Sequence, residues 1–125
     1  MTTVIVIDDD RNIVMLLSDL LEMFGIRIVG KGYNGSDAVE LYKKLNPDIV
    51  FTDVMMPRTD GFYALEKIRE YDPNAKVVAV TADLTSETAK RLKVLKVSAI
   101  VYKPFDITEI KQVLMTKLDI KINDA

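Results

Sequence analysis

Side chains that can bind a cation or a phosphoryl group follow four short apolar runs of this sequence. Asp8 and Asp9 follow the first run, Asp53 ends a later one, and Thr81 and Lys103 follow two more. Short apolar runs rich in β-branched residues are typical of central strands in a parallel sheet, which are buried on both faces. Because ligands bind beyond the carboxyl ends of such strands, we expect these five side chains to share one crevice.

The acidic residues among them predict a magnesium site. Carboxylates a few ångströms apart cannot all stay ionised unless a cation lies between them. The chain has no histidine and no cysteine, so its metal ligands must be oxygen atoms, which favours a hard cation such as Mg²⁺. Asp10, the next acid, is better explained as the N-cap of a helix. We therefore expect Asp8, Asp9 and Asp53 to bind the metal.

Asp53 is the candidate nucleophile. A carboxylate can attack a phosphoryl group to form an aspartyl-phosphate, and the protein's task is then to position the reactants and stabilise charge on the phosphoryl oxygens. Lys103 would pair with Asp53 at rest and with a phosphoryl oxygen afterwards. The hydroxyl of Thr81 and the backbone N–H of Ala82 would contact the other oxygens. Lys103 or Thr81 alone would be an ordinary strand-end residue, but together they favour a phosphoryl site.

The hydrophobic pattern predicts five strands that alternate with five helices. The expected strands are 4–7, 26–29, 49–53, 76–80 and 98–102. The expected helix N-caps are Asp10, Asn34, Thr85 or Ser86, and Asp106. The glycines at 30, 32 and 35 are expected to loosen the chain after the second strand, and residues 58–61 to form a turn. This alternation is typical of an α/β fold, with a doubly wound, five-stranded parallel sheet and helices on both faces.

Length and composition indicate one domain. A chain of 125 residues, 49% hydrophobic and 29% charged, is long enough for a single core covered by helices. We assign residues 1–119 to this domain. Residues 120–125 have no clear pattern and are expected to form a frayed C-terminal tail or the start of a linker.

Charge and hydropathy exclude some classes of partner. The net charge of −2 gives no overall drive toward nucleic acid or an anionic membrane, and no apolar run approaches membrane-spanning length. We therefore expect a cytoplasmic protein that binds neither. The fourth expected helix is basic and should be a solvated face or meet an acidic partner; its cations are Lys90, Arg91, Lys93 and Lys96.

The ordered set of motifs resembles the response regulator receiver family, from Thr3 to about Leu118. The set is Ile7-Asp8-Asp9, Asp53 with Met56-Pro57 and Asp60-Gly61, Val80-Thr81-Ala82, and Lys103-Pro104-Phe105. Each motif is common alone, and their order within the expected elements makes the set specific. The resemblance implies a flavodoxin-like receiver fold.

The resemblance also implies how the site works. Asp9 and Asp53 would bind Mg²⁺ directly with the backbone carbonyl of Met55, and Asp8 would act mostly through water. A sensor histidine kinase would phosphorylate Asp53 as part of a two-component phosphorelay. The face made by the fourth helix, fifth strand and fifth helix would then bind an output protein or a fused effector domain. Such a receiver is no enzyme beyond its own phosphorylation and slow dephosphorylation, and it often has a cis Lys103-Pro104 bond.

Several positions depart from the family pattern. Ile100 stands where the family usually has its switch aromatic, and Tyr102 lies two residues further on, on the same side of the strand. We treat both as candidate switch residues. Met55 stands where many relatives have a polar residue, and Asp83 is the second residue after Thr81.

Three other functions share part of the pattern. A magnesium-dependent phosphatase of the haloacid-dehalogenase type also uses a strand-end aspartate, but its motif has a second aspartate where this chain has Met55. A flavodoxin-like electron carrier needs a phosphate loop rich in Ser, Thr and Gly after the first strand, where this chain has acids. A degenerate receiver that only docks partners is not supported, because the key acids and the lysine are all present. The phosphatase stays the alternative to a receiver.

Overall fold

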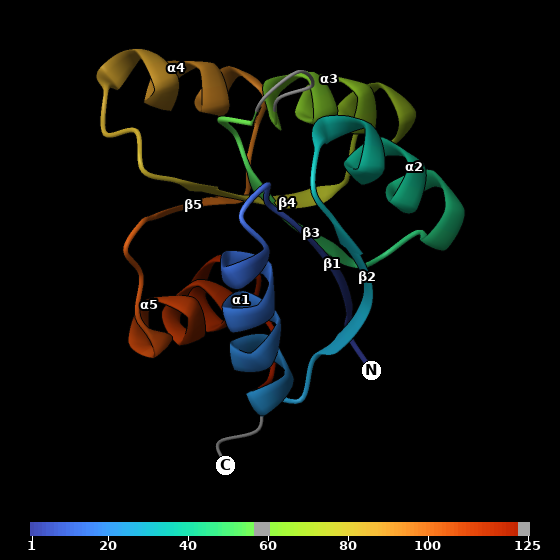
Figure 1. Cartoon of the computed structure of the whole chain (residues 1–125), viewed down its shortest axis with the longest axis vertical. Helices are drawn as coiled ribbons and strands as arrows, with labels where there is room; N and C mark the ends of the chain where they lie inside the picture. The colour runs from blue at the N-terminus through green and yellow to red at the C-terminus, as the bar shows by residue number, and fades with distance from the viewer. Residues whose placement is uncertain (57–60, 123–125) are drawn as a thin grey trace.

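The computed structural model describes residues 1–56 and 61–122. Five parallel strands form one sheet in the order β2-β1-β3-β4-β5 (Figure 1). They are β1 (Thr3–Ile7), β2 (Arg27–Gly32), β3 (Ile49–Asp53), β4 (Lys76–Thr81) and β5 (Ala99–Tyr102). The chain goes outward from β1 to β2 and then crosses to the other side of β1 for β3, and in such sheets a ligand crevice opens at that point.

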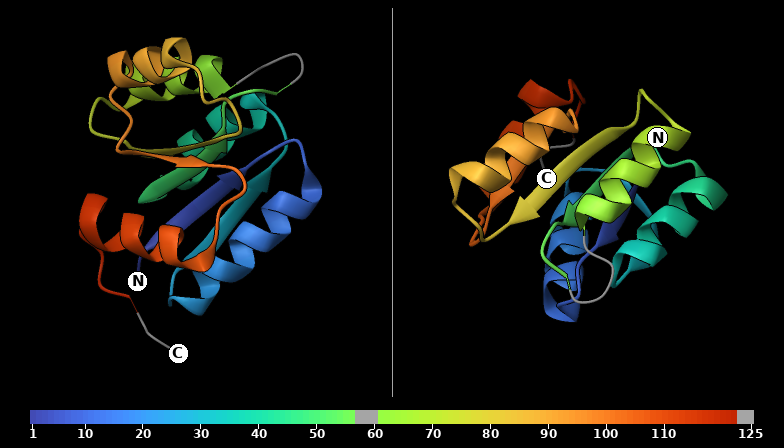
Figure 2. Two further views of the ribbon diagram at one scale, coloured as in Figure 1. Left: turned by 90° about the vertical axis from the view of Figure 1, so that its left-hand side faces the viewer. Right: turned by 90° about the horizontal axis from the view of Figure 1, so that it is seen from above.

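Helices cover both faces of the sheet, as predicted. Within the described residues these are α1 (Arg11–Met23), α2 (Gly35–Leu45), α3 (Gly61–Tyr71), α4 (Ser86–Val94) and α5 (Ile107–Gln112), which the π-helical turn η1 (Val113–Lys117) continues. Figures 1 and 2 show α1 and α5 side by side on one face and α2, α3 and α4 on the other. The doubly wound α/β fold expected from the hydrophobic pattern is confirmed.

Helix starts follow from local sequence. The carboxylate of Asp10 accepts a hydrogen bond of 2.9 Å from the N–H of Asn12 at the start of α1. Asn34, Thr85 and Asp106 cap α2, α4 and α5, each through the N–H of the residue three positions further on. Each cap satisfies an N–H group of the first turn that has no partner within the helix. These predicted caps are confirmed.

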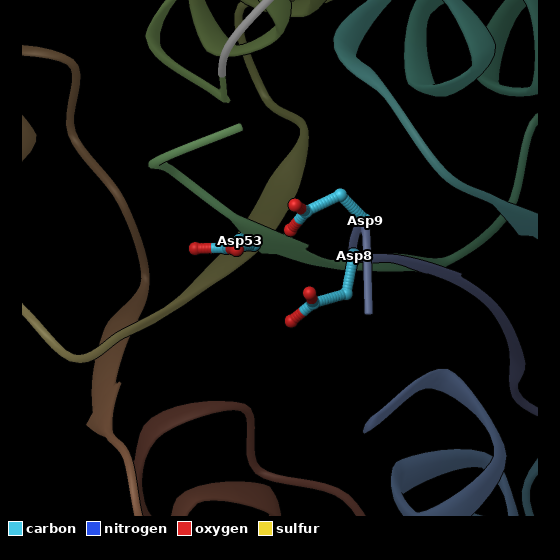
Figure 3. A group of neighbouring side chains, drawn as sticks. All are labelled: Asp8, Asp9 and Asp53. Atoms are coloured by element: carbon cyan, nitrogen blue, oxygen red, sulfur yellow. The ribbon is translucent and has the colours of Figure 1, made fainter. Parts of the chain in front are cut away.

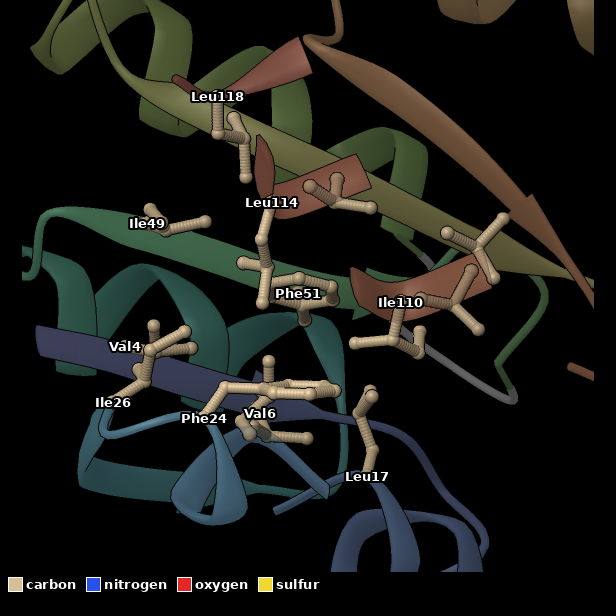
Figure 4. Close-up of a cluster of buried hydrophobic side chains, with 14 of the residues drawn as sticks. Val4, Val6, Leu17, Phe24, Ile26, Ile49, Phe51, Ile110, Leu114 and Leu118 are labelled. Atoms are coloured by element: carbon tan, nitrogen blue, oxygen red, sulfur yellow. The ribbon is translucent and has the colours of Figure 1, made fainter. Parts of the chain in front are cut away.

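Two apolar clusters attach the helices to the sheet. On the α1 and α5 face, Leu17, Ile110 and Leu114 pack around Phe51 of β3, and none of the four is more than 2% exposed (Figure 4). The cluster on the opposite face includes Ala38, Leu65 and Leu92, which come from α2, α3 and α4. Burial of one such leucine or isoleucine contributes about 1.5–3 kcal/mol. Packing on both faces fixes the central strands and therefore the residues at their carboxyl ends.

The second strand is longer than predicted. It continues to Gly32 instead of ending at Val29, so Gly30 and Gly32 lie within β2 and do not loosen the chain. Gly32 is buried, and a Cβ atom there would lie 2.7 Å from the Cβ of Asp37 and 2.8 Å from the Cδ1 of Ile7. The absent side chain lets α2 pack closely on the sheet, which is a packing role rather than a loop signal.

The chain after η1 packs back onto the core. The N–H of Ile120 donates a hydrogen bond of 2.9 Å to the carbonyl of Leu114, and Ile120 and Ile122 lie partly buried against the α1 and α5 cluster. Residues 120–122 are therefore attached, and the prediction of a frayed tail is wrong for them. The domain boundary at residue 119 stays a prediction.

Two expectations remain, the turn at residues 58–61 and the absence of a membrane-spanning segment. Residues 57–60, which hold Pro57 and most of the predicted turn 58–61, lie outside the described residues. Along 1–56 and 61–122, every helix is too short or too polar to cross a bilayer.

Candidate functional site

Three carboxylates meet at the carboxyl ends of β1 and β3. Ile7 pairs with Thr52 in the parallel register, so the residues that follow, Asp8 and Asp53, are neighbours. One carboxylate oxygen from each of Asp8, Asp9 and Asp53 lies within 4.8 Å of the others. Figure 3 shows these side chains at the two strand ends. Asp8 and Asp53 are 1% and 5% exposed, whereas Asp9 faces solvent, so the cluster is open on one side.

Backbone groups orient the two buried carboxylates. Oδ1 of Asp8 accepts a hydrogen bond of 2.9 Å from the N–H of Asp10, and Oδ1 of Asp53 accepts one of 3.2 Å from the N–H of Met55. The N–H of Asp8 donates to the carbonyl of Gly32, 3.2 Å away, which ties the end of β1 to the end of β2. The Oδ2 atoms of both acids face a cation instead.

That cation is Lys103, but its closer partner was not predicted. The Nζ of Lys103 lies 2.7 Å from Oδ2 of Asp8 and 3.4 Å from Oδ2 of Asp53. The expected pair with Asp53 is present, but the pair with Asp8 is tighter. To form it, the side chain reaches past β4 and β3 to the end of β1. The Lys103-Pro104 peptide bond is cis, as the receiver resemblance implies.

The charges of the cluster do not cancel. Burial raises the pKa of Asp8 to about 6, although the hydrogen bond from Lys103 opposes that shift. Burial lowers the pKa of Lys103, but the hydrogen bond to Asp8 and the charge of Asp53 outweigh it, so the pKa lies above its ordinary value. One lysine faces three carboxylates, which leaves excess negative charge.

This donor set fits Mg²⁺. All three side chains offer oxygen atoms, they converge within one metal-sized space, and the exposed side at Asp9 leaves room for the water that Mg²⁺ usually keeps. A small divalent cation would also offset the excess negative charge of the cluster.

The hydroxyl expected to contact a phosphoryl group lies on the next strand. Asp53 pairs with Val80 in the register, so Thr81 stands one residue beyond it at the end of β4. Thr81 is fully buried, and its Oγ1 accepts a hydrogen bond of 3.0 Å from the N–H of Asp83. Ala82 is exposed at the start of the loop toward α4.

Asp83 has a role that the sequence pattern did not indicate. Its Oδ2 accepts a hydrogen bond of 2.6 Å from the Thr88 hydroxyl, and its Oδ1 accepts one of 2.9 Å from the Thr85 N–H. Its carboxylate is therefore engaged with the start of α4. The sequence indicates this contact only by an acidic residue in a loop shortly before two threonines, a pattern too common to be specific.

The structure also shows where the residues that depart from the receiver pattern lie. Met55 is 57% exposed at the rim of the site, and Tyr102 is 36% exposed at the end of β5. Ile100 is half-buried against the cluster beneath α2, α3 and α4. It also lines a groove of about 310 Å³ between β5 and the helical segment α5–η1, together with Val101, Glu109, Gln112, Val113, Thr116 and Lys117.

The chain is similar in sequence and in fold to known proteins. A family model for the response regulator receiver domain matches residues 4–115. The chemotaxis protein CheY of Thermotoga maritima is 34% identical over 113 residues, which cover 89% of this chain and 92% of that protein. Protein CcdB of Bacillus subtilis is 36% identical, with 88% of this chain and 92% of that protein covered. The crystal structure of the CheX-CheY-BeF3-Mg complex from Borrelia burgdorferi contains a chain with a TM-score of 0.89 and 30% identity, covering 96% of this chain and 90% of that one.

The phosphatase alternative gains nothing from these findings. An exposed methionine stands where the haloacid-dehalogenase pattern has its second aspartate, and the matched family model is a receiver. The strand order, the acid cluster with its lysine, and the matched sequences agree with one another. The chain therefore belongs to the response regulator receiver family and is a signalling domain rather than a classical enzyme.

Proposed function

We propose that Asp53 accepts a phosphoryl group from a sensor histidine kinase in a reaction that depends on Mg²⁺. The observation that carries this proposal is a 5% exposed carboxylate at a strand end, within metal-binding distance of two other carboxylates and 3.4 Å from a lysine. Such a carboxylate is oriented, and it is paired with a lysine that can stabilise phosphoryl oxygens.

The cation would be held by oxygen atoms of Asp8, Asp9 and Asp53, with the carbonyl of Met55 added by resemblance to the family. Bound Mg²⁺ would neutralise charge on the carboxylates and on the phosphoryl oxygens. The similar structure from Borrelia burgdorferi supports this assignment, since it is a complex that contains beryllofluoride and magnesium.

Each residue of the site has its own task in the transfer. A carboxylate oxygen of Asp53 attacks phosphorus, the bond between phosphorus and the kinase histidine nitrogen breaks, and that nitrogen keeps the electron pair. The carboxylate of Asp53 thereby becomes an acyl phosphate, and Lys103 binds one of the phosphoryl oxygens. The hydroxyl of Thr81 and the N–H of Ala82 donate to the others.

The proposed output face consists of α4, β5 and α5. Phosphorylation would draw Thr81 inward and change how β5 and α4 pack, with Ile100 and Tyr102 as candidate switch residues. The groove between β5 and the α5–η1 segment lies on this face and offers a site for an output protein or a fused effector domain. Kinase and receiver would meet in the cytoplasm.

Intact mass after incubation with acetyl phosphate tests the acceptor. In Mg²⁺ the wild-type chain should gain the mass of one phosphoryl group, and Asp53→Asn should gain none. Asp19→Asn is the matched control, because Asp19 is an exposed aspartate of α1, and it should be labelled like wild type. Labelling of Asp53→Asn at the wild-type level would refute the acceptor, and labelling unaffected by EDTA would refute the metal dependence.

The donor class needs a second experiment. A panel of sensor histidine kinases with ATP should include at least one that transfers to the wild-type chain and not to Asp53→Asn. If acetyl phosphate labels the protein but no kinase does, the kinase part of the proposal fails while the acceptor stands.

A further inference from the structure

Helix α4 is held at its C-terminal end by one side chain of α3. The guanidinium of Arg69 donates hydrogen bonds to the carbonyls of Leu95 and Lys96, which follow α4, at 3.2 and 3.0 Å. It also donates to the carbonyls of Pro73 and Ala75, before β4, at 2.9 and 2.8 Å. Because four backbone oxygens converge on a rigid planar group, this end of α4 is fixed to α3 and to the start of β4.

The N-terminal end of α4 is held in a different way. The Asp83 carboxylate binds the hydroxyl of Thr88, in the first turn, and the N–H of the N-cap residue Thr85. Thr88 is only 7% exposed, and its hydroxyl makes a short bond of 2.6 Å to the partly exposed carboxylate of Asp83. The hydrogen bonds from Thr88 and Thr85 hold the pKa of the Asp83 carboxyl below its ordinary value, as expected of an acceptor bound in its charged form.

Asp83 is also bonded to Thr81. Its N–H donates to Oγ1 of Thr81 at 3.0 Å, so a single residue binds the strand-end hydroxyl with its backbone and α4 with its side chain. A rotation that carries Oγ1 of Thr81 toward Asp53 would take the acceptor away from that N–H. The loop would then release or shift the carboxylate that holds the first turn of α4.

We propose that Asp83 is the positioning residue that transmits the state of Thr81 to the N-terminal end of α4, while Arg69 keeps the C-terminal end in place. The motion is thus a pivot about residues 95–96 rather than a displacement of the whole helix. This inference rests on the proposed function for the event that moves Thr81, but the coupling between Thr81 and α4 exists without phosphorylation.

A double-mutant cycle on the unphosphorylated chain tests the coupling. Thr81→Val keeps the shape of the side chain and removes the hydroxyl, and Asp83→Ala removes the carboxylate. Loss of one hydrogen bond should change amide hydrogen exchange by about fivefold at Thr88 and Ala89, the first-turn amides of α4 that are hydrogen-bonded. In the Asp83→Ala background, Thr81→Val should change those amides by less than about twofold, since coupled residues are non-additive.

A second set of amides and a substitute variant separate this role from a general loss of packing. Amides 94–96 at the Arg69 end should keep their wild-type exchange in every variant. If Asp83→Ala does not fold, Thr88→Val replaces it, because that change removes only the hydroxyl that binds Asp83 and keeps a β-branched side chain. Equal effects of Thr81→Val in both backgrounds, or equal changes at both ends of α4, would overturn the proposal.

The result of the double-mutant cycle does not depend on whether Asp53 accepts a phosphoryl group. Acetyl phosphate labelling of the wild-type chain decides whether Asp53 is the acceptor, and the cycle decides whether Asp83 connects Thr81 to α4. Thr88→Val should be labelled at Asp53 like wild type, since Thr88 touches none of the acids at the site. If the cycle shows coupling between Thr81 and α4 but acetyl phosphate does not label Asp53, the proposed function is contradicted and the coupling through Asp83 is still supported.

Discussion

At the scale of single residues, the site consists of acids that burial makes costly and one lysine that cannot neutralise them all. Asp8 and Asp53 are almost fully buried and share Lys103, whereas Asp9 is exposed. Asp10, next in the chain, turns away to accept a hydrogen bond from the N–H of Asn12. Adjacent aspartates therefore have different tasks, and substitutions should separate them.

We expect Asp9→Ala to weaken Mg²⁺ binding by roughly tenfold or more, because it removes one of three converging carboxylates. Asp10→Ala should change the affinity little and instead lower the stability of the protein by about 1 kcal/mol through loss of the α1 cap. Calorimetric titration and urea unfolding measure the two effects. Equal losses of affinity would show that the assignment of ligand and cap is wrong.

The sequence predicts these residues unequally well. Asp8, Asp53, Thr81 and Lys103 could be found because an apolar run ends at or next to each of them, and the ends of parallel strands meet. The tighter pair between Lys103 and Asp8 could not, because it depends on how far a flexible side chain reaches across two intervening strands. The turn of the Asp83 carboxylate toward Thr88 is likewise a matter of loop geometry.

At the scale of elements, local signals predict helix starts, and packing decides what local signals leave open. N-caps such as Asn34 and Thr85 act within one turn, so the sequence alone identifies them. Glycine is a residue type common in loops, but Gly32 lies in a strand. A residue without a side chain is needed there because helix α2 packs against it. The π-helical turn that extends α5 had no recognisable signal in the apolar stripe.

Gly32→Ala should destabilise the protein by about 1–3 kcal/mol, since the new Cβ would overlap Asp37 and Ile7 at under 3 Å. Gly30→Ala is the matched control in the same strand, because its Cβ would meet only methyl groups of Ile5, Leu41 and Leu45, at 3.1 Å or more. Urea midpoints should fall clearly for the first variant and less for the second. A reversed order would contradict the packing role of Gly32.

A tyrosine links α2 to the end of α3. The Tyr42 hydroxyl donates a hydrogen bond of 2.7 Å to Asp72, and that bond, with the N–H of Asn74, holds the pKa of the Asp72 carboxyl below its ordinary value. A carboxyl with a lowered pKa in the folded state stabilises the protein above its unfolded pKa. This contribution is lost as the pH falls through the folded pKa.

Tyr42→Phe should therefore cost about 1 kcal/mol at pH 7, and the deficit should be smaller at pH 3, which lies below the ordinary pKa of an aspartate, so that Asp72 is largely protonated in the unfolded chain. Tyr71→Phe is the control, because that ring forms a T-shaped pair with Tyr42 but its hydroxyl takes no part in the bond to Asp72. Urea unfolding at both pH values measures the difference. A deficit that is equal at pH 3 and pH 7 would exclude an ionised partner.

At the scale of the whole molecule, two apolar layers enclose one sheet, and the C-terminal segment completes the layer on the α1 and α5 face. Ile120 and Ile122 reach that layer although the segment that contains them has no periodic pattern of its own. Their contribution could not be predicted, because two isolated isoleucines give no helix or strand period.

Ile120→Asn should lower the stability by about 1–2 kcal/mol, since it exposes apolar surface of the core and places an amide there. Lys121→Asn, at the exposed neighbouring position, should have almost no effect. Chemical unfolding of both variants gives the comparison. An Ile120→Asn protein as stable as wild type would mean that residues 120–122 only rest on the surface.

The bonds of Arg69 have a consequence for tolerance to mutation. All four of its acceptors are backbone carbonyls, so a substitution at Leu95, Lys96, Pro73 or Ala75 leaves the acceptor atoms in place. Residues around the end of α4 can therefore vary, for instance to suit different binding partners, without moving that end. The weak point is Arg69 itself, because a lysine carries a compact ammonium and cannot present a planar fork to four oxygens. A single position on α3 thus sets how much sequence freedom the surface of another helix has.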